Sequence, residues 1–279
     1  MSIRIIADSG SDIVNYGREE LTVLPMTITF QGVEYLDSVN LSHREFYEKL
    51  VESDELPTTS QIAPYRFEEE IKKAKDKGED VLIITISSEL SGTYQSACIA
   101  ASDYEGVRVI DALNVAVGER VLVDRAFDLM DQGKTLDEIA DDLDECRNRV
   151  RVLAVLDTLE YLKKGGRISP AVAFAGNVLN IKPVVTVEEG KVVLLGKARG
   201  SKQGNNFLRQ QCEKTGIDFS MPICLGYTGF SDEMIKKYAH DSAVLWKDYK
   251  ESLPIVSIGG TIGTHVGPGA IAVAFFEPR

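Results

Sequence analysis

The sequence predicts an α/β fold with two domains that share a cleft, an N-terminal domain on a parallel sheet and a C-terminal domain on a mixed sheet. The chain has 279 residues, more than one typical domain contains. Its first half alternates apolar strands with helices, which is typical of a parallel sheet. Its second half adds a hairpin, which requires antiparallel pairing. We therefore expect domains over residues 1–150 and 151–279.

The first half supplies the strands and helices of the parallel sheet. Its buried strands are the apolar runs IRIIAD, DVLIITIS and VRVIDA. Helices are expected over HREFYEKLVES, YRFEEEIKKAKDKG and SGTYQSACIAASDY, and around residues 115–131 and 135–150. Ligands of such sheets bind at the carboxyl ends of the strands. Polar residues that follow these strands are therefore the first candidates for a site.

Two segments interrupt this alternation. The β-rich residues near 21–40 predict a small hairpin insertion that turns at Gln31-Gly32. The stretch LPTTSQIAP, residues 56–64, is bounded by prolines and predicts a loop rather than a regular element. The first domain should therefore carry a small β insertion beside its parallel sheet.

The second half has a different order of elements. It begins with the predicted strand RVLAVLD, the short helix TLEYLKKGG and the apolar helix PAVAFAGNVLNI. The segment KPVVTVEEGKVVLLGKAR predicts a hairpin that turns at Glu189-Gly190. Helices around residues 201–214 and 232–248 flank the apolar MPICLGYT, and PIVSIGG and AIAVAFFE are closing strands. Together these elements predict a mixed α/β layer.

Composition and charge exclude several classes of protein. A net charge of −12 disfavours nucleic acid as a partner, because phosphate backbones are bound by clustered Lys and Arg. No apolar run approaches the ~20 residues that span a bilayer, so no stable membrane insertion is expected. The strand IRIIAD begins at once and leaves no room for a signal peptide, so we expect a cytoplasmic protein. No metal, zinc or redox site is expected from the scattered cysteines Cys98, Cys146, Cys212 and Cys224.

The charge is unevenly distributed along the chain. Residues 1–146 carry 13 Lys and Arg against 31 Asp and Glu, residues 147–202 carry 11 against 4, and residues 203–279 carry 7 against 8. The sums of −18, +7 and −1 return the total of −12. The basic middle segment could bind an acidic protein surface or an anionic ligand. The alternative is that it forms a basic face in contact with solvent only.

Three polar clusters interrupt apolar sequence, each in a predicted loop. They are Thr58, Thr59 and Ser60; Ser91, Gly92 and Thr93; and Thr264, His265 and Gly267. Each cluster has a structural explanation, because Ser, Thr and Gly favour turns and helix caps. Hydroxyls and free backbone N–H groups at the start of a helix also bind anions. Spacing alone leaves both interpretations open.

Several motifs of the chain resemble one protein family. In order, they are IIADSGSD, PTTSQ, ISSELSGTYQSA, YLKKGGRIS, KPVVTVEEGKV and HVGPGAIAVAFF. They resemble the DegV family, which includes the fatty-acid-binding subunits of bacterial fatty acid kinases, and the resemblance covers nearly the whole chain. It implies a protein that encloses one long-chain fatty acid, with the tail inside and the carboxylate at the domain junction. Such a protein binds lipid without a cofactor and performs no chemistry of its own.

The resemblance also implies which residues bind the carboxylate. They are Thr59 of the TSQ loop, Ser91 of the SGT turn and His265 near the C-terminus, with Ser60, Gly92 and Thr93 as second contributors. Hydroxyls and backbone N–H groups satisfy a carboxylate without placing a full cation in the pocket. Most of the affinity would come from the tail, since about 0.8 kcal/mol per buried methylene gives a 16-carbon chain on the order of 12 kcal/mol before ordering costs.

Apolar residues near the C-terminal half are candidates for the tail lining. They are Phe174, Val178, Leu179, Phe275 and Phe276. An apolar stripe is more often plain core, so this assignment competes with a purely structural one.

The resemblance further implies a partner in phospholipid metabolism. Fatty acid kinases add a separate subunit, similar to dihydroxyacetone kinases, that supplies ATP and Mg²⁺ and phosphorylates the presented carboxylate. Arg167 of GGRIS and Arg199 and Lys202 of GKARGSKQG are the candidate docking residues, or would neutralise the acyl phosphate. After Arg199 the family usually has a denser basic run, whereas GSKQGNN follows here. This departure weakens the docking inference more than the lipid-binding one.

Two other functions compete with lipid binding. A serine esterase would use Ser91 as nucleophile and His265 as base, but LSGTYQ lacks the GxSxG elbow of such enzymes. A phosphate- or nucleotide-binding protein would show a Walker or GxGxxG pattern, and GGTIG is only a Gly-rich segment.

Overall fold

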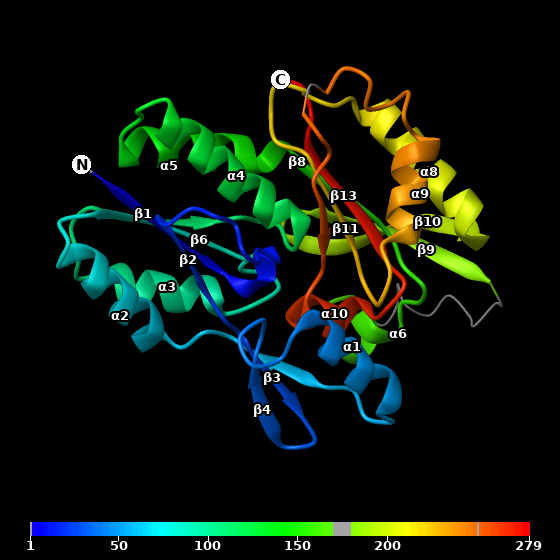
Figure 1. Ribbon diagram of the computed structural model, residues 1–279, viewed down its shortest axis with the longest axis horizontal. Coiled ribbons are helices and arrows are strands. Elements are labelled where there is room, and N and C mark those ends of the chain that lie inside the picture. The colour runs from blue at the N-terminus through cyan, green and yellow to red at the C-terminus, as the bar shows by residue number, and fades with distance from the viewer. Residues whose placement is uncertain (1, 170–179, 250) are drawn as a thin grey trace.

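The fold is described from a computed structural model that places residues 2–169, 180–249 and 251–279. Within these ranges the chain forms a four-stranded, a six-stranded and a three-stranded sheet. Figure 1 shows the four-stranded sheet in one half of the molecule and the six-stranded sheet in the other, with the small sheet at the edge between them. The predicted α/β fold is confirmed.

The four-stranded sheet is parallel throughout. Its order is β2-β1-β6-β7, with β1 (Ile3–Asp8), β2 (Leu21–Leu24), β6 (Asp80–Thr85) and β7 (Val107–Asp111). Figure 1 shows α2 (Pro64–Lys75) and α3 (Thr93–Ala101) on one face, and α4 (Val117–Asp131) and α5 (Leu136–Cys146) on the other. Because both faces are covered, the central strands are continuous apolar runs, as the sequence predicted.

The small sheet shows that the predicted hairpin over residues 21–40 was only partly right. Its hairpin is β3 (Thr27–Phe30) and β4 (Val33–Leu36), which turns at Gln31-Gly32 as predicted. The prediction was wrong for the preceding strand β2, which pairs with β1 instead of joining the hairpin. Pro25 lies between β2 and β3, and a proline cannot donate to a ladder, so it separates the two strands.

The predicted loop over residues 56–64 contains a strand. Thr58–Ser60 forms β5, which pairs antiparallel with β3. A three-residue strand is too short to show alternation in the sequence, and it forms because the edge of β3 offers free backbone groups. This pairing fixes the position of Thr59.

The six-stranded sheet is mixed. Its order is β10-β9-β8-β13-β11-β12, and β11 and β12 form its one parallel pair within the described residues. The strands are β8 (Val150–Val155), β9 (Ile181–Glu188), β10 (Lys191–Arg199), β11 (Cys224–Tyr227), β12 (Ile255–Ser257) and β13 (Ile271–Phe276). Its outer face carries α8 (Gly200–Thr215) and α9 (Glu233–Asp241). The predicted hairpin with its turn at Glu189-Gly190 is confirmed, whereas the predicted helix over 232–248 ends at Asp241. The predicted helix PAVAFAGNVLNI falls mainly outside the described residues.

Helix α4 packs between the two sheets. Alternate residues of β13 face in opposite directions, as the period of a strand requires. Val273 and Phe275 pack with the core under α8 and α9, while Ala274 and Phe276 belong to a larger core that includes Val121 of α4. This larger core contains residues from both sides of position 150, so the two halves share one hydrophobic interior.

Three short helices complete the fold. They are α1 (His43–Glu52), α6 (Glu160–Lys164) and α10 (Gly260–Val266). The sequence predicted α1 and α6, but placed residues 260–266 in a loop, which was wrong. Gly260 and Gly263 concealed this helix, because glycine is a poor helix former. A Cβ on Gly263 would lie 2.6 Å from the ring of Phe46, so the glycine is needed for close packing against α1.

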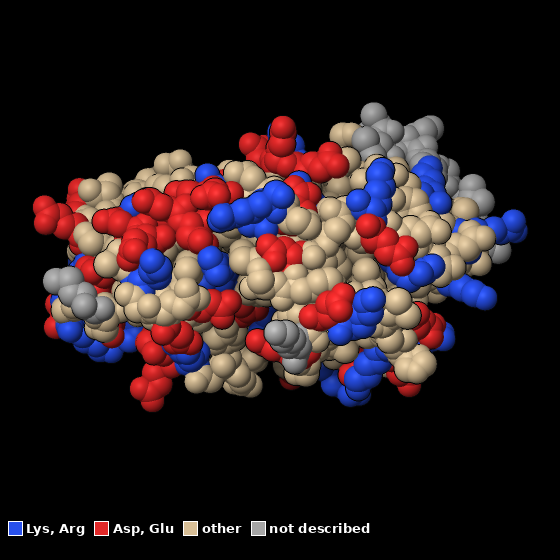
Figure 2. All heavy atoms as spheres, turned by 90° about the horizontal axis from the view of Figure 1, so that it is seen from above, with Lys and Arg blue, Asp and Glu red and all other residues tan. Residues whose placement is uncertain are grey.

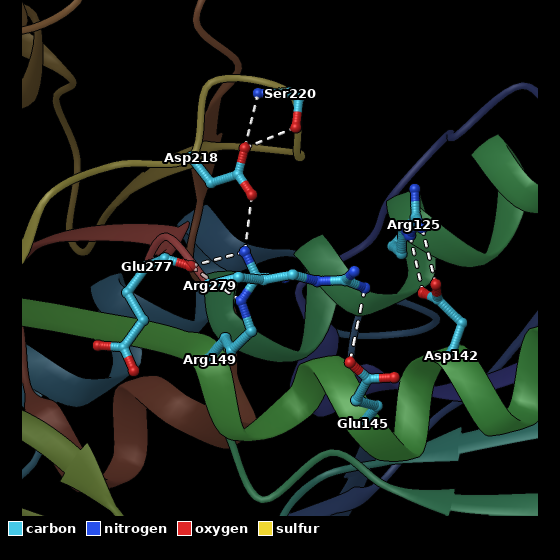
Figure 3. A network of polar contacts seen from close by, with 8 residues as sticks. All are labelled: Arg125, Asp142, Glu145, Arg149, Asp218, Ser220, Glu277 and Arg279. Atoms are coloured by element: carbon cyan, nitrogen blue, oxygen red, sulfur yellow. Dashed lines mark hydrogen bonds and ion pairs between the residues drawn. The ribbon is translucent and has the colours of Figure 1, made fainter.

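Polar side chains tie the C-terminal end to the start of β8. The Arg149 guanidinium donates to Asp218 Oδ2 at 2.6 Å and to the carbonyl oxygen of Glu277 at 2.7 and 2.9 Å. Arg279 lies 3.5 Å from Glu145 of α5 (Figure 3). These contacts join segments from both halves of the sequence.

Charge is divided between the two halves of the molecule. Figure 2 shows acidic side chains gathered over the half that holds α4 and α5, and more basic side chains over the other half. The uneven charge of the sequence is therefore also uneven in space. No helix in the described ranges has the length and apolar character needed to cross a bilayer.

Candidate functional site

A cavity lies where β5, the turn between β6 and α3, α6 and α10 meet. Its polar lining comes from both halves of the sequence: Thr59, Ser60, Gln61, Ser91, Arg167, Thr261 and His265. The structure therefore brings together four of the predicted carboxylate-binding residues, Thr59, Ser60, Ser91 and His265. The other two, Gly92 and Thr93, lie directly behind Ser91 without lining the cavity.

Thr59 and His265 are in direct contact. Thr59 Oγ1 lies 3.0 Å from His265 Nε2, so the three-residue strand β5 and helix α10 meet at this point. When Nε2–H donates to Thr59 Oγ1, the hydroxyl proton of Thr59 is free to donate to an oxygen in the cavity. This pair therefore offers an anion a hydrogen-bond donor whose orientation is fixed by the imidazole.

The imidazole of His265 is neutral near pH 7. Burial, followed by the positive charge of Arg167, lowers its pKa from 6.5 to about 4. A neutral ring has a single N–H donor. No partner of its buried Nδ1 is found among the described residues.

Gly165 allows His265 to occupy this position. A Cβ on Gly165 would lie 2.2 Å from His265 Nδ1, a distance that no real contact shows. The φ of this glycine is negative, so the requirement is for space and not for backbone freedom. The Gly165-Gly166 pair at the end of α6 therefore makes room for His265 as well as ending the helix.

Ser91 both caps a helix and lines the cavity. Its Oγ accepts the backbone N–H of Thr93 at 3.3 Å and lies 2.9 Å from Thr93 Oγ1. Thr93 is fully buried, and its Oγ1 accepts the backbone N–H of Ile62 at 3.4 Å. The two interpretations of this cluster, helix capping and anion binding, are therefore compatible.

Gly92 brings the two polar loops together. A Cβ on Gly92 would lie 1.9 Å from Gln61 Oε1, so any larger residue would require the Gln61 side chain to move. Gln61 in turn donates to Ser96 Oγ of α3 at 3.0 Å. The loop after β5 is thereby held against the first turn of α3.

An apolar cavity adjoins the polar one. Val115, Leu162, Val192, Ile262 and Val266 line both cavities. Further in, the walls are formed by small and branched residues of the six-stranded sheet, among them Val152, Ala154, Val185, Val187 and Ala272. The arrangement is that of a site with a polar end and an apolar interior.

None of the predicted tail-lining residues that the structure describes is found in the lining of the two cavities, and the others fall outside the described residues. Phe275 packs under α8 and α9, and Phe276 belongs to the core around α4. Neither lines the two cavities, where β13 contributes Ala272 instead. Phe174, Val178 and Leu179 fall outside the described residues.

The predicted docking residues separate into two groups. Arg167 lines the polar cavity, and it donates to the carbonyl oxygens of Leu90 at 3.2 Å and Gly165 at 2.7 Å. Arg199 and Lys202 are exposed at the end of β10 and the start of α8, away from the cavity lining. Only Arg167 is therefore placed to act on a ligand in the cavity.

The arrangement does not form a serine hydrolase triad. His265 Nε2 contacts Thr59, and no contact between His265 and Ser91 is found among the described residues. A triad also needs an acid that orients the histidine, and Asp8 instead accepts the backbone N–H groups of Gly10 and Ile86, both at 2.8 Å. Among the described residues, Ser91 therefore has no base in contact with it.

Several lining residues were not predicted from the sequence. Gln61 is the last residue of the PTTSQ motif, and its place in that motif could have identified it as a site residue. Thr261 lies on α10, which the sequence did not reveal as a helix. The apolar lining residues could not be distinguished from ordinary core residues by their pattern.

Comparison with known proteins gives a consistent result along the chain. The family model described as "Uncharacterised protein, DegV family" matches residues 2–278. A DegV domain-containing protein of Clostridium acetobutylicum is 37% identical over 279 residues, covering 99% of this chain and 98% of the relative.

Solved structures of similar proteins share the fold. One, from Thermus thermophilus, is described as a fatty-acid-binding DegV family protein, with a TM-score of 0.88, 32% identity and full coverage (100%) of both chains. Another, from Thermotoga maritima, is described as a DegV lipid-binding protein, with a TM-score of 0.87, 26% identity and the same coverage (100%).

Proposed function

This chain belongs to the DegV family, and we propose that it binds one long-chain fatty acid, with the carboxylate in the polar cavity and the tail in the apolar one. The observation that carries this proposal is that the polar and the apolar cavity adjoin and share five lining residues. An amphiphile with one polar end and a long apolar chain matches this arrangement. The similar protein from Thermus thermophilus is described as binding fatty acid.

The polar end suits a carboxylate. Thr59 and Ser91 supply hydroxyls, and His265 supplies one N–H donor or orients the Thr59 hydroxyl. Helix α3 begins directly behind Ser91, and the positive end of its dipole favours negative charge there. Arg167 contributes positive charge at the cavity while its side chain is anchored on two backbone carbonyls.

The apolar end suits an acyl chain. Its walls consist mainly of Val, Ala, Leu and Ile side chains from α10, β8, β9, β10 and β13. Burial of methylenes at about 0.8 kcal/mol each provides most of the free energy of binding.

We further propose that the bound carboxylate is presented to a separate kinase subunit, so that this chain acts as the non-catalytic subunit of a fatty acid kinase. Arg167 supports this role, because it lies at the cavity and can neutralise charge as an acyl phosphate forms. Arg199 and Lys202 are exposed and available for an acidic partner surface. Reconstitution with a dihydroxyacetone-kinase-like subunit, ATP and Mg²⁺ should yield acyl phosphate, and Arg167→Gln should reduce the yield more than it reduces fatty acid binding.

The first test of the lipid proposal is mass spectrometry of the purified protein that has never been delipidated. The native mass should exceed the sequence mass by one fatty acid, and organic extraction should release that acid in stoichiometric amount. A protein that is empty, and that also fails to take up added palmitate or oleate, would contradict the proposal.

A further inference from the structure

A separate cleft lies between the start of α1, helix α4 and strand β12, and none of its lining residues is shared with the polar cavity described above. Its volume is about 410 Å³, within the range of small-molecule sites. Its polar lining includes Asp12, His43, Arg120 and Ser257. Asp12 is the last residue of the motif IIADSGSD, whereas His43, Arg120 and Ser257 belong to none of the DegV motifs quoted above and line neither of the two cavities.

Arg120 is the most unusual residue of this cleft. Its side chain on α4 is 14% exposed, and its nearest carboxylate, Asp124 Oδ2, lies 3.8 Å from Nε, too far for a hydrogen bond. Nε is buried without a partner, and no hydrogen bond from the other guanidinium nitrogens is found within the described ranges. Buried polar groups nearly always have partners, so the buried Nε–H of Arg120 requires an explanation, although the guanidinium also lies over the ring of Tyr16, 5.4 Å from its centroid.

The wall opposite Arg120 offers further donors. β12 is the last strand of its sheet, so one of its edges has no neighbouring strand among the described residues. Leu225 N–H donates to Pro254 O at 2.9 Å, and Ile258 N–H donates to Tyr227 O at 2.8 Å, so even-numbered residues of this segment face β11. By alternation, the N–H groups of Ile255 and Ser257 point away from β11, toward the free edge.

Two titratable residues complete the lining. His43 Nε2 lies 3.0 Å from Ser38 Oγ, and burial lowers the pKa of this imidazole, so it is neutral near pH 7. Asp12 accepts the N–H of Gly259 at 2.7 Å, and burial raises the pKa of its carboxyl well above the usual range. Because burial disfavours the charged form of Asp12, its carboxyl repels an anion less than an exposed carboxylate would. The nearest carboxylate to Arg120 is that of Asp124, whose Oδ2 lies 3.8 Å from Nε.

We propose that this cleft binds the oxyanion group of a small polar molecule, a carboxylate or a phosphate, through the Arg120 guanidinium and the free edge of β12. Arg120 supplies a planar set of donors that matches either group in a bidentate manner. The outward N–H groups and the hydroxyl of Ser257 would bind the remaining oxygens. The cleft is large enough to hold the rest of a metabolite-sized ligand beside the anionic group. The proposal is independent of fatty acid binding, since the two sites share no lining residue.

The proposal is tested by NMR titration of the ¹⁵N-labelled full chain with inorganic phosphate and, separately, with acetate. We expect saturable shifts of the Arg120 Nε–H signal and of the backbone amides of Ile255 and Ser257 with at least one probe. Arg120→Gln should weaken that binding about tenfold or more, because it removes the charge and keeps a polar side chain of similar reach. No shift with either probe up to about 10 mM, or shifts confined to other residues, would overturn the proposal.

A matched control is available on the same helix. Arg125 of α4 pairs with Asp142 at 2.8 Å and lies outside the cleft (Figure 3). Arg125→Gln should leave probe binding unchanged, while an equal loss in both variants would show that only general charge matters and would overturn the site. If Arg120→Gln loses its fold by circular dichroism, Ser257→Ala decides the question. It should weaken binding several-fold, and unchanged affinity in that variant would contradict the proposed wall.

Discussion

Asp37 Oδ2 accepts the backbone N–H of Thr261 at 3.1 Å, although 224 residues separate them in the sequence. Asp37 Oδ1 accepts the N–H of Gly260 at 3.2 Å, so one buried carboxylate from the end of the β3–β4 hairpin satisfies the first two residues of α10. Helix α10 carries His265 and has no cap of its own. The position of His265 thus depends on a side chain from the opposite end of the chain.

Asp37→Asn should destabilise the protein by about 1 to 3 kcal/mol, because an amide can accept only one of the two N–H groups and leaves the other unsatisfied. The thermal unfolding midpoint should fall by several degrees. Asp54→Asn, in an exposed loop, is the control and should leave the midpoint unchanged. Equal midpoints for the two variants would show that Asp37 does not anchor α10.

Thr59→Val and Ser91→Ala should each weaken fatty acid binding by about ten- to a hundredfold, the effect of losing one hydrogen bond to a charged group. Affinity is measured by competition with a fluorescent fatty acid on delipidated protein. Thr58→Val and Ser88→Ala are matched controls, because Thr58 and Ser88 are exposed neighbours that do not line the cavity. Unchanged affinity in both test variants would remove the proposed carboxylate site while leaving the apolar cavity in question.

Stability should fall as the pH drops from about 6.5 to about 4, because of His265. Its folded pKa of about 4 lies below its ordinary value of 6.5, so the unfolded chain binds more protons in this window. At a pH below both pKa values the full loss of stability is present, and at a pH above both there is no loss. His265→Gln removes this contribution, so the difference in unfolding midpoint between variant and wild type should change across the window and stay constant above it. A constant offset at every pH would mean that His265 is not protonated more readily in the unfolded chain.

Glu119→Gln should stabilise the protein more at pH 8 than at pH 5. Burial, followed by the charges of Asp8 and Asp12, raises the pKa of Glu119 well above its ordinary value of 4.5. At a pH above 4.5 the folded chain therefore holds more protons than the unfolded chain does, so the stability of the wild type falls as the pH rises. The unfolding midpoints at the two pH values decide the matter, with Glu55→Gln, on the surface, as a control that should show no such difference.

The regular elements were predictable where burial left a strong pattern. β1 and β6 are almost fully buried and appear in the sequence as continuous apolar runs. The turns at Gln31-Gly32 and Glu189-Gly190 were predictable because glycine accepts the positive φ of 81° and 78° that these turns use. By contrast, β5 and α10 have few residues and owe their form to neighbours distant in sequence, so no local pattern revealed them.

The motifs of the sequence identified the residues of the candidate site but did not predict which of them are in contact. The sequence contained Thr59, Ser91 and His265 in three separate segments, and their family resemblance suggested a shared role. It did not indicate that Thr59 touches His265 or that Gly165 makes room for the imidazole. Nor did it separate Phe275 and Phe276, which are plain core, from Ala272, which faces the apolar cavity.

The sequence by itself determined the chemical character of this protein: two α/β halves, apolar strands, and polar Ser-, Thr- and His-containing motifs suited to an anion. Those properties depend on residue type and on spacing along the chain, which the sequence records directly. Only the tertiary structure decided which side chains meet, because a hydrogen bond such as that between Thr59 and His265 joins residues 206 positions apart. Such contacts are fixed by the packing of helices and sheets on a shared core, and packing depends on the whole chain at once.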